Sequence, residues 1–295
     1  MKRIILLIAA MVLSGLTTQV SADESDWNKV AQALGKSGSI QPGDIYKVSL
    51  PRTDLKVTVD GVTIKPALAL GSWVAFKPMG TKSMLMGDLV LTGTEIPVVM
   101  SRLLDNSIDV TAIHNHLLRS QPAIYYMHVG AEGDPIKIAH ALHEALSASA
   151  TPFAPPASTT QSADIDLDTK ALDATLGYKG KVAGGVYQFS IPRADITRDD
   201  SMEIPPSMGM ALGINFEPTG SGKAAIAGDL VLLSKEVNPV LHALHDHGIE
   251  ITALHSHMIN DDPHMFFMHF WANADAVQLA NGLRAAIDKM NVKKG

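Results

Sequence analysis

The stretch that decides the fold is GDLVLTGTEIPVVMSRLLDNSIDVTAIHNHLLRSQPAIYYMH, from Gly87 to His128, because the chain contains it twice. The second copy, GDLVLLSKEVNPVLHALHDHGIEITALHSHMINDDPHMFFMH, runs from Gly228 to His269. The two copies align without a gap, 141 residues apart. Upstream, YKVSLPRTD has a counterpart in YQFSIPRAD at the same offset, so the duplication extends beyond the block.

The duplication divides the 295-residue chain into four predicted segments. These are a signal peptide at 1–22, repeat one at 23–148, a linker at 149–163 and repeat two at 164–295. The predicted linker, SATPFAPPASTTQSA, is rich in Pro, Ala, Ser and Thr and has little apolar surface to bury.

The first segment has the pattern of a secretory signal. Lys2 and Arg3 precede the apolar run IILLIAAMVLSGL, and the small-residue stretch VSA ends at Ala22. The run is too short for a comfortable span, and no later stretch approaches the ~20 apolar residues that a membrane helix needs. We therefore expect export, cleavage after Ala22 and no stable membrane insertion afterwards.

Charge and cysteine content exclude several classes of partner. The formal net charge is −6 and the chain has no run of Lys or Arg, which argues against nucleic acid as a partner. The absence of cysteine excludes disulfides, thiolate ligands and a lipid anchor on cysteine. Any bound metal must therefore be held by nitrogen or oxygen.

The hydrophobic periodicity of each repeat predicts strands first, and then a helix, two strands and a helix. Repeat one is predicted to contain a hairpin at 56–64, strands at 72–80 and 82–92, a helix from Ile96, strands at 109–117 and 123–129, and a helix after Pro135. This order predicts the α+β class. We expect the two strand-rich units to pack as a pseudo-two-fold pair.

Three histidines recur at the same spacing in each repeat. His114 and His116 are two residues apart on a predicted strand, so their side chains point to the same face. Pairing across the hairpin places His128 opposite Ala112, beside His114. The pattern therefore predicts three imidazoles on one sheet face of each repeat. The six predicted metal ligands are His114, His116, His128, His255, His257 and His269.

A three-imidazole set matches a zinc site with an open position, and copper is the other ion that we expect. Imidazole also suits iron and nickel, so the sequence does not decide the metal. The competing interpretation is that these histidines only fill a half-exposed strand. Their spacing is retained while the residues between them differ, which favours ligation, although common descent explains part of the match. The pattern is compatible with two separate sites or one shared site.

Matched carboxylates form a second group. Glu95 and Glu236 are the candidate catalytic residues, as a general base, a fourth ligand or an acceptor for an imidazole N–H. Stabilisation of a helix start explains them equally well. Asp88 and Asp229 allow the same roles, and for them turn stabilisation is the better explanation.

Other recurring residues have structural interpretations. A local ion pair that closes a turn is preferred to an anion clamp for Arg52 with Asp54 and for Arg193 with Asp195. Met127 and Met268 adjoin a site histidine but face away from it, which favours core packing over copper ligation. His140 and His143 are expected at the surface, and His242, His245 and His247 near the end of a helix. His264 is expected to face away from His269.

The repeated block GDLVL…TA[IL]H-x-H…P…MH resembles the LppY/LpqO family of bacterial envelope proteins, whose repeated domain has no known function. The resemblance covers nearly the whole predicted mature chain and implies export and the duplicated architecture. It carries no activity or ligand. The chain departs from the lipoprotein members because it lacks the anchoring cysteine, which favours a free periplasmic location over a tethered one.

Three functions follow from these residues. The first is an exported protein that binds zinc or copper for buffering, delivery or sensing. The second is an envelope hydrolase, either metal-dependent with water in the open position or using paired histidines as acid and base. Two-histidine phosphoesterases have a hydroxyl residue where this chain has His116 and His257, which counts against the latter form. The third is a non-catalytic envelope scaffold. The expected partner is a metal ion or a small molecule, and the sequence does not decide whether the protein is an enzyme.

Overall fold

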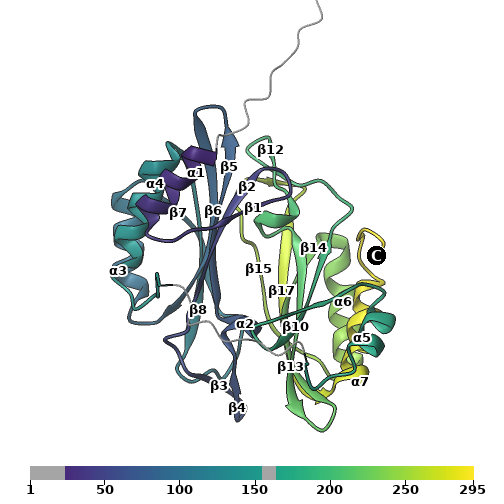
Figure 1. Ribbon diagram of the computed structural model, residues 1–295. Helices are drawn as coiled ribbons and strands as arrows, with labels where there is room; N and C mark the ends of the chain where they lie inside the picture. Colours follow the sequence, from purple (N-terminus) through teal and green to yellow (C-terminus); the bar gives the residue numbers. More distant parts are fainter. Residues whose placement is uncertain (1–23, 155–163) are drawn as a thin grey trace, which may run out of the picture.

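The computed structural model describes residues 24–154 and 164–295. In this part of the chain, two six-stranded antiparallel sheets lie face to face, and helices cover the outer face of each sheet (Figure 1). Each repeat supplies one sheet with its helices, so the predicted α+β class and the duplicated strand-rich unit are confirmed. The predicted signal peptide and most of the predicted linker (residues 155–163) lie outside the described residues.

The first sheet has the strand order β1-β2-β5-β6-β8-β7. Its strands are β1 (Ser39–Gln41), β2 (Ile45–Pro51), β5 (Gly71–Met79), β6 (Lys82–Thr92), β7 (Asp109–His114) and β8 (Ile124–Gly133). The helices that pack on it are α1 (Glu24–Leu34), α3 (Ile96–Asp105) and α4 (Pro135–Leu146). Helix α4 begins where the sequence predicted, because the Asp134 carboxylate accepts hydrogen bonds from the N–H groups of Ile136 and Lys137.

The second sheet has the corresponding order β15-β17-β14-β13-β10-β9. Its strands are β9 (Lys181–Ala183), β10 (Val186–Pro192), β13 (Ala211–Gly220), β14 (Lys223–Leu233), β15 (Glu250–His255) and β17 (Met265–Asp275). Its helices are α5 (Thr169–Leu176), α6 (Ser234–Asp246) and α7 (Ala276–Ile287). The predicted strands, hairpins and helices of the repeated block are therefore present in both halves.

Short elements join the two halves and differ between them. Repeat one contributes the predicted hairpin β3 (Val57–Val59) and β4 (Val62–Ile64), and helix α2 (Pro66–Ala69). Repeat two has instead a small sheet of β11 (Arg198–Asp199), β12 (Met202–Glu203) and β16 (Asp261–Asp262), and a 3₁₀ turn η1 (Pro206–Met208). The sequence did not predict these elements. Helix α1 was also not anticipated.

The strands of the two sheets are apolar on both faces, because helices cover the outer face of each sheet and the other sheet covers its inner face. On β6, Leu85 and Leu89 pack outward against the helices, whereas Val90 faces the other sheet. A hydrophobic cluster between the sheets draws on both repeats, including Val57, Leu68, Val90, Tyr126, Val186, Ala225, Ala227 and Trp271. The inner faces therefore form a common core, and the histidines must share the rest of this space.

Polar contacts across the junction fix how the two halves meet. Asn215 Nδ2 donates to the carbonyl of Leu68 at 2.9 Å, and Gln188 Nε2 donates to the carbonyl of Ala67 at 2.8 Å. At another point, Arg119 forms ion pairs with Asp60 of its own repeat and with Glu250 of the other. Among the described residues, no helix combines the length and the apolarity that crossing a membrane would require.

Candidate metal centre and adjoining cavity

The hairpins β7–β8 and β15–β17 position the six predicted histidines. Ala112 pairs with His128, as the sequence predicted, and Ala253 pairs with His269. A bulge between Val110 and Ala112, repeated between Ile251 and Ala253, shifts the register of each hairpin by one residue. His114 and His255 end their strands, and the second histidine of each His-x-His motif follows two residues later.

The six imidazoles form one cluster between the sheets instead of a separate trio in each repeat. His114 stacks on His255 with ring centroids 3.5 Å apart. His116 lies against His269, and His128 against His257, each with centroids 3.6 Å apart. Each of these pairs joins the two repeats. The sequence had left a shared site and two separate sites open, and the structure brings the histidines together in a shared one.

Contacts within each repeat complete the cluster. The Nε2 atoms of His114 and His128 are 2.9 Å apart, and those of His255 and His269 are 2.8 Å apart. His116 stacks on Tyr126, and His257 stacks on Phe267 at the equivalent position. These aromatic walls hold the second histidine of each motif, which lies beyond the end of its strand.

The backbone contacts of His255 and His269 determine where their lone pairs point. A carbonyl oxygen only accepts hydrogen bonds, so the Nδ1–H of His269 donates to Gly228 at 3.0 Å, and the Nδ1 of His255 faces the carbonyl of Ser256 at 3.3 Å. A neutral imidazole carries one N–H, so this arrangement leaves both Nε2 atoms with lone pairs. With the proton of each ring on Nδ1, the two lone pairs face each other across 2.8 Å and can bind a cation, whereas a proton on Nε2 of His255 would form a hydrogen bond between the rings.

The protonation state of the cluster suits metal binding. Burial, together with the neighbouring His255, lowers the pKa of His114 to about 3, and burial lowers the pKa of His255 to about 4. Burial and the other histidines hold the pKa values of His116, His128, His257 and His269 well below the ordinary value. The rings are therefore neutral near pH 7, and protons do not occupy the lone pairs that would bind a metal.

Four of the histidines lie close enough together to hold a metal ion. His114, His255, His257 and His269 each offer a ring nitrogen, and these four nitrogens all lie within 4.8 Å of one another. Nε2 of His116 and Nε2 of His257 are buried without a hydrogen-bond partner. The donor set consists of nitrogen atoms from both repeats, which suits zinc or copper better than magnesium or calcium.

Two aspartates border the cluster. The preferred interpretation of both as turn residues is wrong, because Asp88 lies within β6 and Asp229 within β14. Asp88 Oδ1 lies 3.9 Å from His128 Nε2, and Asp229 Oδ1 lies 3.8 Å from His269 Nδ1. Burial raises the pKa of Asp88 to about 8, against the attraction of Lys47. Burial and the charge of Asp88 raise the pKa of Asp229 well above its ordinary value. Both Oδ1 atoms are buried without a hydrogen-bond partner.

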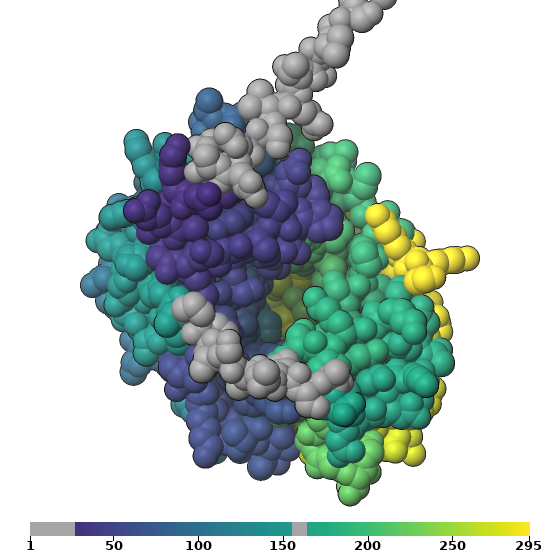
Figure 2. Space-filling model, in the orientation of Figure 1, coloured from purple at the N-terminus to yellow at the C-terminus, as the bar shows by residue number. Residues whose placement is uncertain are grey.

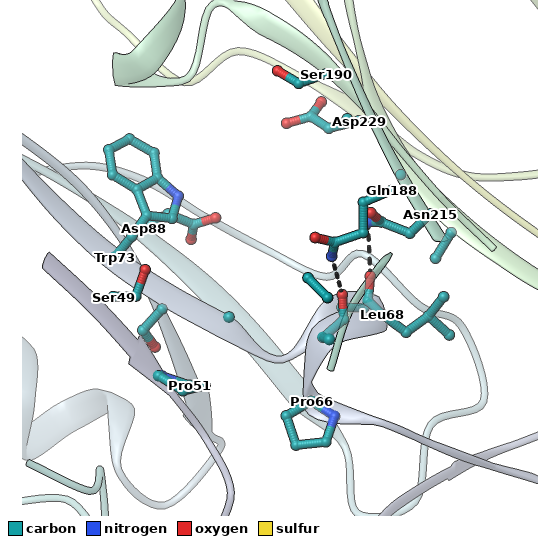
Figure 3. Close-up of a pocket in the computed structure, with 18 of the residues that line it drawn as sticks. Ser49, Pro51, Pro66, Leu68, Trp73, Asp88, Gln188, Ser190, Asn215 and Asp229 are labelled. Atoms are coloured by element: carbon teal, nitrogen blue, oxygen red, sulfur yellow. Dashed lines mark hydrogen bonds between the residues drawn. The ribbon is translucent and has the colours of Figure 1, made fainter. Parts of the chain in front are cut away.

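A cavity of about 770 Å³ adjoins the cluster between the two sheets. His116, Tyr126, Asp88 and Asp229 line it, together with residues from both repeats. The surface is hollowed between the two halves (Figure 2). The carboxylates of Asp88 and Asp229 point into this space from opposite sheets (Figure 3).

The other polar residues of the cavity come from inward-facing strand positions. Gln188 and Asn215 donate their amide N–H groups to the backbone of α2, which leaves their side-chain oxygens as acceptors (Figure 3). Lys47 lies 4.0 Å from the centroid of the Trp73 ring and donates to the carbonyl of Ser207 at 2.9 Å. Sequence reasoning missed these residues. Strand alternation in YQFSIP could have identified Gln188, because its neighbours Tyr187 and Phe189 pack in the core.

The candidate catalytic glutamates lie in a different environment. Glu95 accepts hydrogen bonds from the buried guanidinium of Arg52 at 2.9 and 3.0 Å, and from the N–H groups of Thr92 and Ala150. Arg52 also binds Asp54 and the carbonyl of Val90. This network joins the end of β6, the start of α3 and the segment after α4, which is a structural arrangement.

Repeat two contains the same network. Arg193 binds Glu236 at 2.8 Å, Asp195, and the carbonyl of Val231 at 2.6 Å, and Glu236 also accepts from the N–H of Asn291. The predicted local ion pairs of Arg52 with Asp54 and of Arg193 with Asp195 are therefore present. The structure does not bring Glu95 or Glu236 to the histidine cluster, and neither residue lines the cavity.

The remaining predicted residues are mostly where the sequence placed them. Met127 and Met268 are fully buried in the core, facing the helices. His264 is half-exposed and binds Asp261 at 2.8 Å, away from the cluster. His143 differs from the expected surface position, because its Nδ1 donates to the carbonyl of Leu34 at 2.8 Å and its ring packs against Phe153.

The fold and the site define a duplicated α+β protein with one histidine cluster between its halves. The chain belongs to the family described as Domain of Unknown Function (DUF1259), whose model matches it twice, at residues 28–148 and 170–289. The expectation of a duplicated domain of unknown function is thereby confirmed. No curated protein matches the sequence.

Two solved structures were found in the structural comparison. The first is a trimeric bacterial microcompartment shell protein, PduB, with 12% sequence identity and a TM-score of 0.23, covering 88% of this chain and 97% of that one. The second is EtuB from Clostridium kluyveri, with 9% identity and a TM-score of 0.20, covering 86% of this chain and 90% of that one.

Proposed function

We propose that this protein binds a transition-metal ion, zinc or copper, at a single centre shared by its two repeats. The observation that carries the proposal is the set of four imidazole nitrogens, one from repeat one and three from repeat two, within 4.8 Å of one another. His114 supplies the first, and His255, His257 and His269 supply the others. His116 and His128 would orient these rings or complete the ligand set in a different metal geometry.

The alternative, that the histidines only fill space, does not account for their polar atoms. A buried polar group without a partner costs about 1–3 kcal/mol, and this cluster contains two such imidazole nitrogens and two such carboxylate oxygens. A divalent cation would bind the lone pairs that face each other. Its charge would also favour ionisation of the neighbouring Asp88 and Asp229, which could then accept imidazole N–H groups or balance the charge of the metal.

We further propose that the two repeats pack about a pseudo-two-fold axis through the cluster. The support is that equivalent pairs of histidines from the two repeats are the same distance apart. His116 to His269 and His128 to His257 are equivalent pairs with the same separation, 3.6 Å, and His114 meets its own counterpart. On a two-fold axis, a residue contacts its own counterpart. Superposition of the two halves in an experimental structure, with a rotation far from 180°, would contradict this packing.

Elemental analysis tests the metal proposal. The purified chain, loaded with zinc and dialysed, is expected to retain one zinc ion per chain. His114→Ala and His257→Ala should lose it, whereas His140→Ala, at an exposed histidine of α4, should retain it. A properly folded wild-type chain that retains neither zinc nor copper would overturn the proposal.

A second candidate, a metal-dependent hydrolase of the envelope, is favoured by the cavity. Its volume of about 770 Å³ is within the usual range for small-molecule sites, and His116 and two aspartates line it. An open coordination position could hold a water molecule for attack on a substrate. Azide added to the cobalt-substituted protein is expected to change its visible spectrum if such a position exists. An unchanged spectrum would leave a carrier or a buffer as the function.

We also propose that the protein is exported to the periplasm as a member of the LppY/LpqO group without the lipid anchor. The support is the pattern of Lys2, Arg3, the apolar run and VSA before Asp23, with no cysteine available for lipidation. Cell fractionation and N-terminal sequencing test this. Mature protein in the periplasmic fraction should begin at Asp23, and a chain that stays in the cytoplasm with Met1 would contradict export.

A further inference from the structure

A second, much smaller pocket borders the same histidine cluster. Its volume is about 20 Å³, which is room for one water-sized body. The imidazoles of His128 and His257 form part of its wall, and the ring of Trp73 forms another part. Four methionines also line it: Met86, Met208, Met210 and Met258. The remaining lining residues are Gly87, Thr111, Val129, Gly209 and Phe267.

One imidazole at this pocket has an unsatisfied nitrogen. His257 is only 7% exposed, and its Nε2 is buried without a hydrogen-bond partner. Phe267 stacks on the ring with centroids 3.4 Å apart, so the ring is fixed in its plane. The pocket is therefore bordered by a fixed imidazole that has an unpartnered nitrogen.

The methionines determine which ion would complete it. A thioether sulfur is a soft ligand that favours copper(I) and adds nothing to the binding of magnesium or calcium. The whole sequence has 14 methionines and no cysteine, so methionine is its only source of soft sulfur ligands. Methionine also fills irregular gaps in cores, which is the competing explanation. Core filling accounts for the sulfur atoms but not for their position beside an imidazole that has an unpartnered nitrogen.

The methionine lining is present around His257 but not around His116, the equivalent residue of repeat one. In the aligned block, Met86 corresponds to Ala227 and Met258 to Leu117. Trp73 pairs with Asp88 in repeat one, and Gly213 pairs with Asp229 in repeat two. Gly213 is therefore the structural equivalent of Trp73. Ala227 and Gly213 line the large cavity. The equivalent region around His116 therefore has no sulfur and is open, whereas the region around His257 is closed and lined with methionine.

We propose that the methionine-lined pocket is a binding site for copper(I), with His257 as the nitrogen ligand and methionine sulfur as the soft ligand. The inference rests on the proposed function, because His257 also belongs to the four-histidine centre. One nitrogen binds one ion, so zinc and copper(I) would compete for the Nε2 of His257. The inference adds to that function the oxidation state of the ion and the residues that select it. The large cavity next to His116 remains free for exchange or for a small molecule.

Silver(I) is the probe, because it has the ligand preference of copper(I) without its redox chemistry. Its affinity for the full chain is measured by competition titration, in parallel with zinc stoichiometry. The variants are Met86→Leu, Met208→Leu, Met210→Leu and Met258→Leu, singly and combined, because Met to Leu nearly conserves volume. Met127→Leu is the matched control, since Met127 is fully buried in the other core and does not line the pocket.

The combined variant is expected to bind silver(I) at least about tenfold more weakly, while zinc stoichiometry and the thermal transition stay unchanged. Met127→Leu should bind silver(I) like the wild type. With methyl-labelled methionine, silver(I) should shift the signals of pocket methionines and leave that of Met127 in place.

Three results separate the inference from the proposed function. Silver(I) binding that survives all four substitutions would overturn the inference and leave the zinc result, and with it the proposed function, intact. Retention of silver(I) by the pocket in a chain that holds neither zinc nor copper(II) would overturn the four-histidine centre alone. Failure of the wild-type chain to bind silver(I), zinc or copper(II) would remove both.

Discussion

His114 and His255 occupy the same position in the two repeats, and their imidazoles stack face to face with ring centroids 3.5 Å apart. Neither repeat can form this contact alone. The same holds for the stacking of His116 on His269, so the cluster exists only where both hairpins are present. The duplicated fold therefore has a histidine cluster that neither repeat contains by itself.

A shared centre makes a stoichiometric prediction. If each repeat held its own metal, His114→Ala would remove one of two ions and His255→Ala the other. With one shared centre, each single substitution should abolish tight zinc binding, with a loss of affinity of about 100-fold or more. Isothermal titration of zinc into the two single variants measures this. A variant that retains half of the wild-type stoichiometry would show that the repeats bind independently.

The buried arginine networks predict a stability effect that is separate from the site. Arg52 is fully buried and binds Glu95, Asp54 and the carbonyl of Val90. Arg52→Leu leaves two carboxylates without their partner, which should cost about 3 kcal/mol of the free energy of unfolding. Urea unfolding followed by circular dichroism checks the value. Lys82→Leu, which removes the exposed ion pair with Glu132, is the control and should change little. An equal effect of the two substitutions would contradict a structural role for the Arg52 network.

Glu95 should also give the protein a measurable acid dependence. Burial opposes its ionised form, but hydrogen bonds from Arg52, Thr92 and Ala150 prevail and lower its pKa from 4.5 to about 2. The folded carboxyl therefore ionises more readily than the unfolded one. Its stabilisation is complete above about pH 4.5 and is lost as the pH falls towards 2.

Glu95→Gln tests this dependence. At pH 6 the variant should be less stable than the wild type by about 2 kcal/mol, after allowance for solvent screening at a half-buried group. The difference should shrink as the pH falls from 4.5 towards 2. Unfolding curves of both proteins across this range provide the measurement. A difference that stays constant over the whole range would mean that the charge of Glu95 contributes nothing.

The sequence predicted the hairpin register well because hydrophobic alternation and the repeated spacing both constrain it. Ala112 opposite His128 followed from the positions of the turn and of the strand residues, and the structure has this pair. What the sequence could not give is the partner of each imidazole across the sheets. The contact between His128 and His257 depends on how two sheets pack face to face, and no local pattern encodes that packing.

The same limit explains the glutamates. Glu95 and Glu236 recur at matching positions, which is equally typical of catalysis and of a structural network. Only the fold shows that Arg52, 43 residues before Glu95, binds its carboxylate. The methionine pocket escaped notice for a related reason. Met86 and Met258 come from different repeats and meet only when the sheets do.

The glycine of the repeated GDLVL motif yields a final prediction, which links the fold to the proposed metal centre. A Cβ atom on Gly228 would lie 2.1 Å from the carbonyl oxygen of Gly213 and 2.7 Å from the ring of Phe270. The carbonyl of Gly228 also accepts the Nδ1–H of His269. Gly228→Ala should therefore force the backbone of β14 to shift, with a loss of about 1–3 kcal/mol of stability. The shift should also displace His269 and weaken zinc binding.

Gly213→Ala is the matched substitution on the neighbouring strand, because a Cβ atom there would meet no atom within 4 Å. Its stability should equal or slightly exceed that of the wild type, since alanine reduces the freedom of the unfolded chain. Thermal unfolding with and without zinc measures both effects for both variants. If Gly228→Ala unfolds at the wild-type temperature and binds zinc normally, the close approach of β14 to β13 does not position His269. If it is destabilised without any loss of zinc affinity, Gly228 supports the sheet alone and the link from this glycine to the imidazole is wrong.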